Sequence, residues 1–268
     1  MPPPRLPSYF VSHGGGPWPW MKEQLGGAYD RLEASLARMP KEIGARPDAV
    51  LMVSAHWEAP VFTVQSGAHP GMVYDYGGFP EFTYHLRYPA PGAPAVAGRV
   101  RELLAAAGIE SAEDAERGFD HGMFAPMAAI WPNADVPTLQ LSLRRGLDPE
   151  AHLALGRALA PLRGEGVVIV GSGLSYHNLR AFGPGARGPS AAFDAWLEAT
   201  LAIADPAQRS ATLAAWEQAP AARLAHPREE HLLPLMVALG AAGSDPAQRT
   251  YHERDFFGGI TVSSWRFG

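Results

Sequence analysis

The sequence predicts an α/β fold in which helices flank a central β-sheet that is mostly parallel or mixed. Short apolar runs alternate with amphipathic segments of helical period, which is typical of this class. Two of the runs are apolar throughout, as strands buried on both faces of a sheet are. No internal repeat or low-complexity linker divides the chain, so we expect one domain over residues 1–268.

The strands are expected where short apolar runs end at a turn. The run SYFVS (8–12) precedes a glycine-rich turn, and AVLMVS (49–54) and GVVIVG (166–171) are continuous apolar segments. Residues 136–143 repeat this pattern. Residues 260–266 are expected to form a closing strand that returns to the edge of the sheet.

Segments of helical periodicity lie between and after these runs. Gly108 and Gly240 each follow such a segment and are expected to end it, because glycine is favoured just past a helix C-terminus. The alternation with strands is the reason to expect parallel pairing. The predicted helices cover residues 21–39, 93–107, 149–162, 190–204, 206–217 and 227–239.

The longest irregular segment, residues 67–92, carries tyrosines and phenylalanines among glycines and prolines. Long ordered loops are often functional, so this segment is interpreted as the wall or lid of an aromatic-lined pocket. The alternative is a surface loop that buries its aromatic side chains for its own stability.

Composition excludes several classes of partner and ligand. The net charge of −5 and the scattered Lys and Arg give no basic stripe, so no nucleic-acid partner is expected. Cysteine is absent, which leaves His, Asp and Glu as the strong side-chain ligands for a metal. No stretch approaches the ~20 apolar residues of a membrane span, and the N-terminus does not resemble a signal peptide. We therefore expect a cytoplasmic protein with no membrane partner.

Histidines follow several of the predicted strands. His13, His56 and His177 come after the first, second and fourth apolar runs, and glycines beside His13 and His177 permit close backbone approach. Ligand sites in open α/β sheets form outside the carboxyl ends of the strands. Imidazole suits divalent transition metals, so the pattern indicates a metal site at this edge. His121 is a weaker candidate, because its neighbour Asp120 also fits a helix cap beside core residues.

Five ordered motifs carry a resemblance that spans nearly the whole chain: SHGGGP, SAHW, GFDHGMFAPM, GSGLSYHNL and HPREEHLLPL. Together they resemble the class III extradiol ring-cleavage dioxygenases, and most closely the DOPA 4,5-dioxygenase type. The segment YDYGGFPEFTYHLRYPAPG is similar to the part of that branch that lies beside the substrate.

The resemblance implies a mononuclear non-haem Fe(II) site that opens a catechol-type ring, DOPA-like or related, with O2. His13 and His56 match two metal ligands. The segment of the third ligand offers both Glu230 and His231, which point about 100° apart if they lie on a helix. We expect His231 to be the ligand and keep Glu230 as a neighbour or alternative ligand.

The resemblance also implies roles for two further histidines. His177 matches the catalytic base that takes a proton from a catechol hydroxyl, and the sequence leaves open whether it also ligates the metal. His121 matches a second pocket histidine that orients the substrate or hydrogen-bonds to oxygen.

Two alternatives from other classes stay open. Histidine-rich sites bind Zn(II) more tightly than Fe(II), so bound zinc is plausible and a zinc hydrolase is one alternative, with His177 activating a metal-bound water. The other is a non-catalytic metal-binding or interaction protein, against which the presence of both His121 and His177 argues. The sequence does not say whether the chain forms a homo-oligomer.

Overall fold

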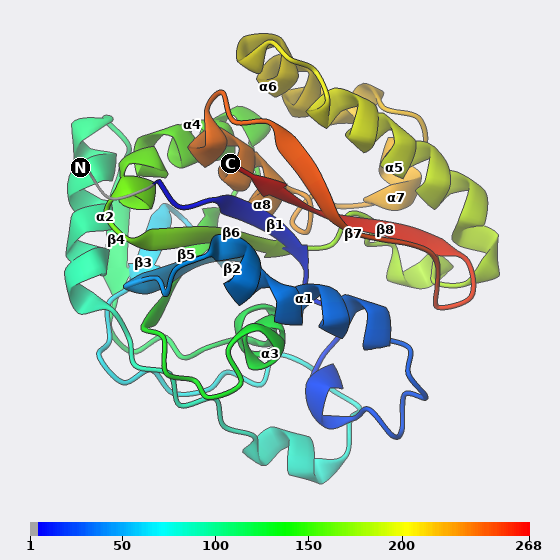
Figure 1. Ribbon diagram of the computed structural model, residues 1–268, viewed down its shortest axis with the longest axis horizontal. Helices are drawn as coiled ribbons and strands as arrows, with labels where there is room; N and C mark the ends of the chain where they lie inside the picture. The colour runs from blue at the N-terminus through cyan, green and yellow to red at the C-terminus, as the bar shows by residue number, and fades with distance from the viewer. Residues whose placement is uncertain (1–4) are drawn as a thin grey trace.

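The computed structural model describes residues 5–268 and contains one eight-stranded sheet (Figure 1). The strand order is β4-β3-β5-β2-β6-β1-β8-β7. Strand β2 pairs in parallel with β5 and β6, and β1 pairs in parallel with β6. Strand β8 runs antiparallel to β1 and to β7, and β3 runs antiparallel to β5. The expected α/β fold with a mostly parallel, mixed sheet is confirmed.

The regular elements have the following bounds. The strands are β1 Ser8–Ser12, β2 Ala49–Ala59, β3 Phe62–Gln65, β4 Ser111–Asp114, β5 Thr138–Arg144, β6 Val167–Gly173, β7 Ala247–Phe256 and β8 Ile260–Phe267. The α-helices are α1 Asp30–Ile43, α2 Pro94–Ala106, α3 His121–Ile130, α4 Pro149–Leu159, α5 Arg187–Leu201, α6 Pro206–Ala214, α7 Ala222–Ala225 and α8 Leu233–Ala242. Short 3-10 turns lie at Trp18–Trp20, Glu81–His85, Ala160–Gly164, Leu179–Ala181, Pro184–Ala186 and Trp216–Gln218.

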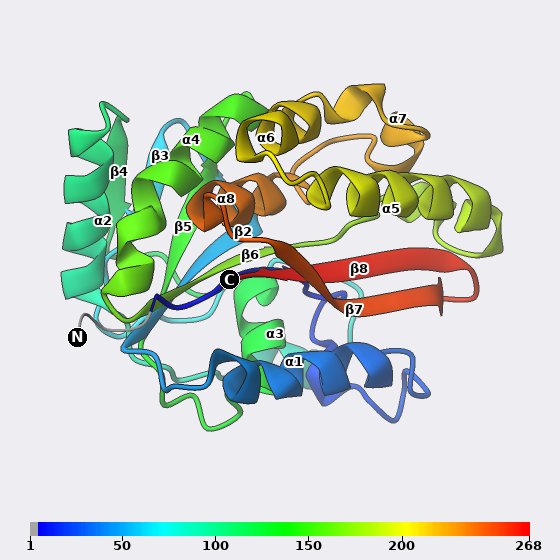
Figure 2. The same ribbon diagram turned by 45° about the horizontal axis from the view of Figure 1, so that its top comes forward.

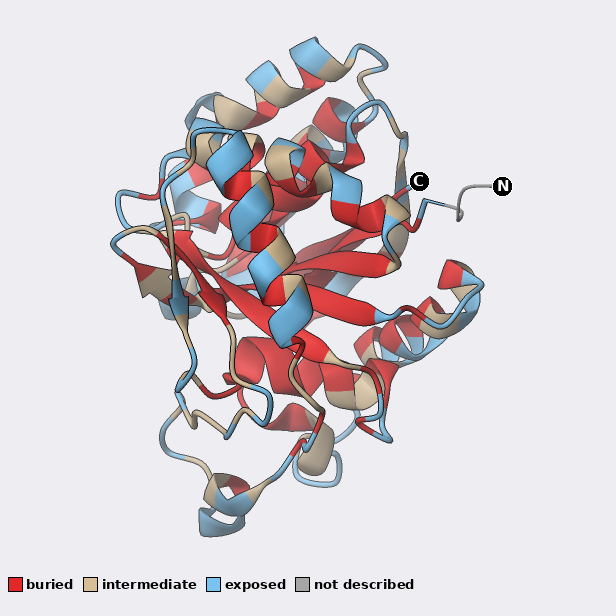
Figure 3. Ribbon diagram, turned by 90° about the vertical axis from the view of Figure 1, so that its left-hand side faces the viewer, coloured by how far each residue is buried: buried red, intermediate tan, exposed pale blue. Residues whose placement is uncertain are grey.

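Helices cover both faces of the sheet. Helices α1 and α3 lie together on one face, and α4, α5 and α8 lie on the other, with α6 packed outside them (Figure 2). The inner strands are therefore buried on both sides, as their continuous apolar runs require (Figure 3). Helix α8 is apolar all round and every one of its residues is buried, because it lies between the sheet and α4. None of the helices in residues 5–268 is long and apolar enough to cross a bilayer.

Several expected boundaries were wrong. Helix α1 begins at Asp30 and not at residue 21, because residues 22–29 form successive turns that include Gly26 and Gly27 at positive φ. Helix α8 begins at Leu233 and not at residue 227, because Pro234 fits only the first turn of a helix. It continues through Gly240, which packs against the Leu153 carbonyl of α4, and ends at Gly243.

The sheet also holds strands that the sequence pattern did not predict. Strands β3 and β4 are four residues each, and β7 is rich in polar side chains, so none has a continuous apolar run. Strand β7 occupies the sheet edge, which places the closing strand β8 one position inside it and not at the edge.

Candidate metal centre

Five histidines from separate segments meet at the carboxyl ends of the parallel strands. We call them the histidine cluster: His13, His56, His121, His177 and His231. His13 follows β1, and His56 lies in the last part of β2, which runs five residues beyond the predicted strand. His177 follows β6, His121 begins α3, and His231 lies in the turn before α8. The structure therefore brings together every histidine that the sequence singled out.

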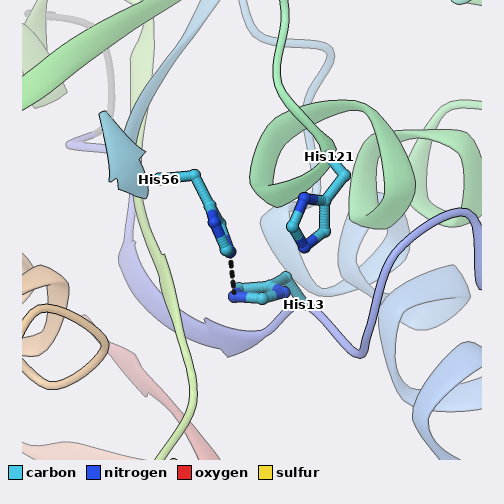
Figure 4. A group of neighbouring side chains, drawn as sticks. All are labelled: His13, His56 and His121. Carbon is cyan, nitrogen blue, oxygen red and sulfur yellow. Dashed lines mark hydrogen bonds between the residues drawn. The ribbon is translucent and has the colours of Figure 1, made fainter. Parts of the chain in front are cut away.

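Three imidazoles of the cluster turn the same ring nitrogen toward one point. His56 Nε2 lies 3.3 Å from His13 Nε2 and 3.3 Å from His231 Nε2. His121 packs beside His56, with ring centroids 3.9 Å apart, and its ring centroid lies 5.4 Å from that of His13. Figure 4 shows how the rings of His13, His56 and His121 converge. Candidate ligand atoms of these three residues lie within 4.8 Å of one another, and the same holds for His177, Glu230 and His231.

These separations fit a shared divalent ion. Two nitrogens held by one metal at about 2.1 Å, and roughly 90–110° apart, lie about 3.0–3.4 Å from each other. His13 and His231 are buried, and His13 Nδ1 has no hydrogen-bond partner within residues 5–268. Imidazoles that direct their ring nitrogens at one buried point fit a cation, because water can no longer satisfy their lone pairs there.

Two carboxylates face Nδ1 of the other four histidines of the cluster. Asp75 Oδ1 accepts hydrogen bonds from the His121 backbone N–H (3.0 Å) and lies 2.9 Å from His121 Nδ1, while its Oδ2 lies 3.3 Å from His56 Nδ1. Glu230 Oε1 lies 2.9 Å from His231 Nδ1 and 3.2 Å from His177 Nδ1. A carboxylate on Nδ1 fixes the ring and directs the Nε2 lone pair away from it, as is usual for metal-bound histidines.

Burial keeps the inner imidazoles neutral. It lowers the pKa of His13 and of His231 well below the ordinary value, and the surrounding histidines lower both pKa values further. Burial, followed by the charge of His121, lowers the pKa of His56 to about 3, although Asp75 acts in the opposite direction. Burial raises the pKa of Glu230, but the hydrogen bond with His177, a backbone hydrogen bond and the charges of His177 and Arg228 together outweigh it, so the pKa of Glu230 falls. Neutral imidazoles beside ionised carboxylates are the protonation states that metal binding needs.

Glycines let the backbone of the cluster close up. A Cβ on Gly173 would stand 2.1 Å from the His231 carbonyl oxygen, and one on Gly171 would stand 2.1 Å from the Pro234 carbonyl oxygen. The end of β6 therefore passes directly against the segment that carries His231, and the Leu174 N–H donates to the His231 carbonyl at 3.1 Å. The expectation that glycine beside His177 serves close approach is confirmed.

Asp120 sets the position of His121. It caps α3 by accepting from the Met123 N–H (3.2 Å), and its side chain also accepts from Ser54 and Gln140 at 2.7 Å each. Both expectations for this segment hold, since Asp120 is a helix cap and His121 lies in the cluster.

A cavity of about 520 Å³ opens over the cluster. Its walls come mainly from apolar side chains, with residues of the predicted loop wall (67–92) on one side. Asp75 and Phe79 of that segment line the cavity, and Tyr76 packs against His121 with ring centroids 5.8 Å apart. Besides the five histidines, the lining residues are Gly14, Gly15, Gly16, Leu25, Tyr29, Asp75, Phe79, Leu174, Leu179, Phe182, Phe256 and Phe257.

The sequence did not indicate Asp75, and it suggested a helix at Glu230 where the structure has a turn. Asp75 lies in an irregular loop with no local motif, so only the fold reveals its contacts with two histidines. Glu230 and His231 lie in a turn and not on a helix, so the 100° argument does not apply; the Glu230 carboxylate turns back onto His231 itself.

Known proteins share the fold and the sequence over most of the chain. The family model described as the catalytic LigB subunit of aromatic ring-opening dioxygenase matches residues 8–268. A 4,5-DOPA dioxygenase extradiol of Portulaca grandiflora is 40% identical over 83% of this chain and 83% of its own length. Dioxygenase tasH of Hapsidospora irregularis is 36% identical over 98% of this chain and 85% of its own length.

A solved structure supports the same relationship. It is titled as an uncharacterized protein from Escherichia coli K12, superposes with a TM-score of 0.79 at 29% identity, and covers 98% of this chain and 100% of that chain. Fold, sequence and histidine cluster agree, and the chain belongs to the LigB family of extradiol ring-cleavage dioxygenases, oxidoreductases that incorporate O2 into an aromatic ring as it opens.

Proposed function

We propose that this chain opens the ring of a catechol-type substrate, DOPA-like or related, at an Fe(II) ion held by His13, His56 and His231. The observation that carries the proposal is the pair of 3.3 Å separations that join the Nε2 atoms of these three residues. Three neutral nitrogen ligands on one side of an ion leave positions for two catechol oxygens and for O2. When bound, Fe(II) supplies Lewis acidity and an electron path between substrate and oxygen.

His231 is preferred to Glu230 as the third ligand. Glu230 already contacts Nδ1 of both His231 and His177, so its carboxylate is occupied in orienting two imidazoles. His121 is assigned to the pocket because its ring packs beside His56, with centroids 3.9 Å apart, without the 3.3 Å Nε2–Nε2 approach that joins His56 to His13 and to His231. Metal content after anaerobic loading tests this assignment: His231→Ala loses iron, whereas His121→Ala retains it.

His177 is proposed as the base that takes the first catechol proton. It lines the cavity, its ring stacks on His231 with centroids 3.3 Å apart, and Glu230 holds its Nδ1. Its Nε2 is thereby left to accept a proton from a hydroxyl in the cavity, and Glu230 stabilises the imidazolium that results. His121, whose ring packs beside that of His56, would hydrogen-bond the substrate or oxygen.

The experiment is oxygen uptake by the Fe(II)-loaded protein with catechols, including DOPA, and formation of a yellow ring-opened product. His177→Ala is expected to keep its iron and lose at least about 100-fold in kcat, the usual contribution of a general base. His69→Ala is the matched control, because His69 is exposed and lies outside the cluster. Turnover equal to that of the unmodified protein in His177→Ala would rule out the base assignment.

Zinc is the main competitor for the site. The Irving–Williams order favours Zn(II) over Fe(II) on the same nitrogen ligands, so we expect protein purified in air to carry zinc and to lack oxygenase activity. Removal of zinc and anaerobic addition of Fe(II) should restore oxygen uptake. Hydrolysis of esters by the zinc form, with no oxygen uptake by the iron form, would instead favour the hydrolase alternative.

A further inference from the structure

The walls of the cavity define which catechols fit. The apolar lining includes Leu179, Phe182 and Phe257, with the buried Phe256 beside them. Phe182 and Phe257 pack with ring centroids 5.4 Å apart, and Phe257 also packs on Tyr29 at 5.5 Å. No Arg or Lys lines the cavity within the described part of the chain, and Asp75 contributes a carboxylate to it.

Two residues of this wall are apolar and yet exposed. Leu179 is 68% exposed and Phe257 is 39% exposed, and they are two of only four large hydrophobic side chains exposed in residues 5–268. Both lie at the cavity, whereas the histidines are buried or half-buried behind them. A ligand that reaches from the cluster toward solvent therefore passes along these two side chains and removes them from water.

The backbone at Phe257 is held in an unfavourable conformation. Phe257 lies in the turn between β7 and β8 with φ +48°, followed by Gly258 with φ +79°. The left-handed region suits Gly, Asn and Asp, and a bulky aromatic residue there is an outlier. The conformation of the turn does not favour phenylalanine, so the backbone is strained where the Phe257 side chain lines the cavity. Residues with such strained backbone angles cluster at functional sites.

We infer that the natural substrate is a catechol with an uncharged, apolar substituent at the ring position that faces the cavity mouth. This inference rests on the proposed function and narrows its substrate class to catechols related to DOPA that lack its charged side chain. The catechol oxygens enter the histidine cluster, and the substituent lies between Leu179, Phe182 and Phe257. A carboxylate at that end of the substrate would lie against these apolar side chains with no Arg or Lys among the lining residues to pair with it, which is unfavourable relative to an apolar group. A volume of about 520 Å³ falls within the range of pockets that enclose substituted ligands.

A matched pair of substrates tests this inference. 4-Propylcatechol and 3-(3,4-dihydroxyphenyl)propionate share a three-carbon side chain and differ in the terminal carboxylate. For the Fe(II)-loaded protein we expect kcat/KM to favour 4-propylcatechol by at least about tenfold, equivalent to ~1.4 kcal/mol. Equal values, or a preference for the carboxylate or for DOPA, would overturn the inference.

A second readout does not depend on the reaction. The monophenols 4-propylphenol and 3-(4-hydroxyphenyl)propionate are titrated into metal-free protein by calorimetry, and the propyl compound is expected to bind at least about tenfold more tightly. If no catechol is oxidised but this binding preference is present, the proposed function fails and the inference about the pocket stands. If catechols are oxidised but the propyl compound does not bind more tightly, the proposed function stands and the inference about the pocket fails.

Variants of the exposed cavity residues test whether their side chains cause the preference for the propyl compound. Leu179→Arg supplies the missing cation at an exposed position and should shift the kcat/KM ratio toward the carboxylate by about tenfold. Phe257→Asn keeps a residue that suits positive φ but removes the ring, so the turn should be at least as stable while the preference for the propyl compound falls. Leu224→Asn is the control, because Leu224 is 58% exposed and does not line the cavity. A ratio that none of the variants changes would show that these side chains do not select the substrate.

Discussion

Replacement of Gly173 by alanine would put a methyl group where the backbone of the His231 segment now lies. The ideal Cβ would be 2.1 Å from the His231 carbonyl oxygen, 3.0 Å from its carbonyl carbon and 3.1 Å from Phe10. Because carbon and oxygen atoms without a bond do not approach closer than about 3 Å, the His231 backbone must retreat by roughly 1 Å. The hydrogen bond from the Leu174 N–H to the same oxygen, 3.1 Å long, would be strained or lost.

The cost follows from these contacts. Overpacking in a dense core costs about 1–3 kcal/mol, and loss of a backbone hydrogen bond adds about 1 kcal/mol. For a chain of this length each kcal/mol lowers Tm by ~2–4 °C, so we expect Gly173→Ala to melt roughly 5–15 °C below the unmodified protein. Displacement of the His231 ring should also weaken Fe(II) binding by at least about tenfold. Loss of a group that orients a metal ligand typically weakens metal binding by about 10–100-fold, and this expectation takes the lower value.

The assays are thermal unfolding of the metal-free protein and anaerobic Fe(II) titration. Gly98→Ala is the control, since its Cβ meets nothing within 4 Å and alanine favours the α2 helix by up to ~1 kcal/mol. A Gly173→Ala protein that melts with the unmodified chain and binds iron equally well would refute the close approach of β6 to His231.

Three further predictions concern the carboxylate, the metal and pH. Asp75→Asn should leave the protein folded but weaken Fe(II) binding by about 10–100-fold, because His56 and His121 lose the carboxylate that fixes their rings; an unchanged titration would contradict this role. Fe(II) at about 100 times its Kd should stabilise the chain by ~2.7 kcal/mol, and a chelator should abolish the rise in Tm, with no rise at all in His231→Ala. Burial lowers the pKa of His152 to about 4, whereas the same side chain in the unfolded chain has an ordinary pKa near 6.5 and therefore binds a proton first as the pH falls. The contribution of His152 to the free energy of unfolding, fully present above pH 6.5, should fall by up to about 3 kcal/mol as the pH drops to 4. Tm measured across this range should fall less steeply in His152→Gln than in the unmodified protein.

Much of the fold follows from local pattern. The strands that hold the cluster contain mostly apolar, buried residues, as burial on both faces of a sheet requires, and their ends were expected within about five residues. Strand β7 escaped prediction because it consists mainly of polar residues, which an edge strand tolerates. The start of α8 escaped because the segment before Pro234 contains charged residues that suit a helix equally well until the proline is placed at its first turn.

The candidate site was also predictable only in part from the sequence. Their place after apolar runs gave His13, His56 and His177 a signal in the sequence, with glycines near His13 and His177 as a further one, and the ordered motifs added His121 and His231. Asp75 had no such signal in the sequence, because its contacts with two imidazoles arise when a long irregular segment folds over the end of the sheet. Contacts of that kind depend on tertiary structure alone.

The position of β1 has a consequence for how the protein matures. This strand is made first, yet both of its neighbours in the sheet, β6 and β8, are encoded later, and β8 ends at Phe267. A nascent chain therefore holds His13 without the neighbouring strands that fix it until β6 and β8 have been made, and the proposed ligand set is incomplete until His231 has followed. Fragments that stop before these segments should be unable to hold the proposed metal.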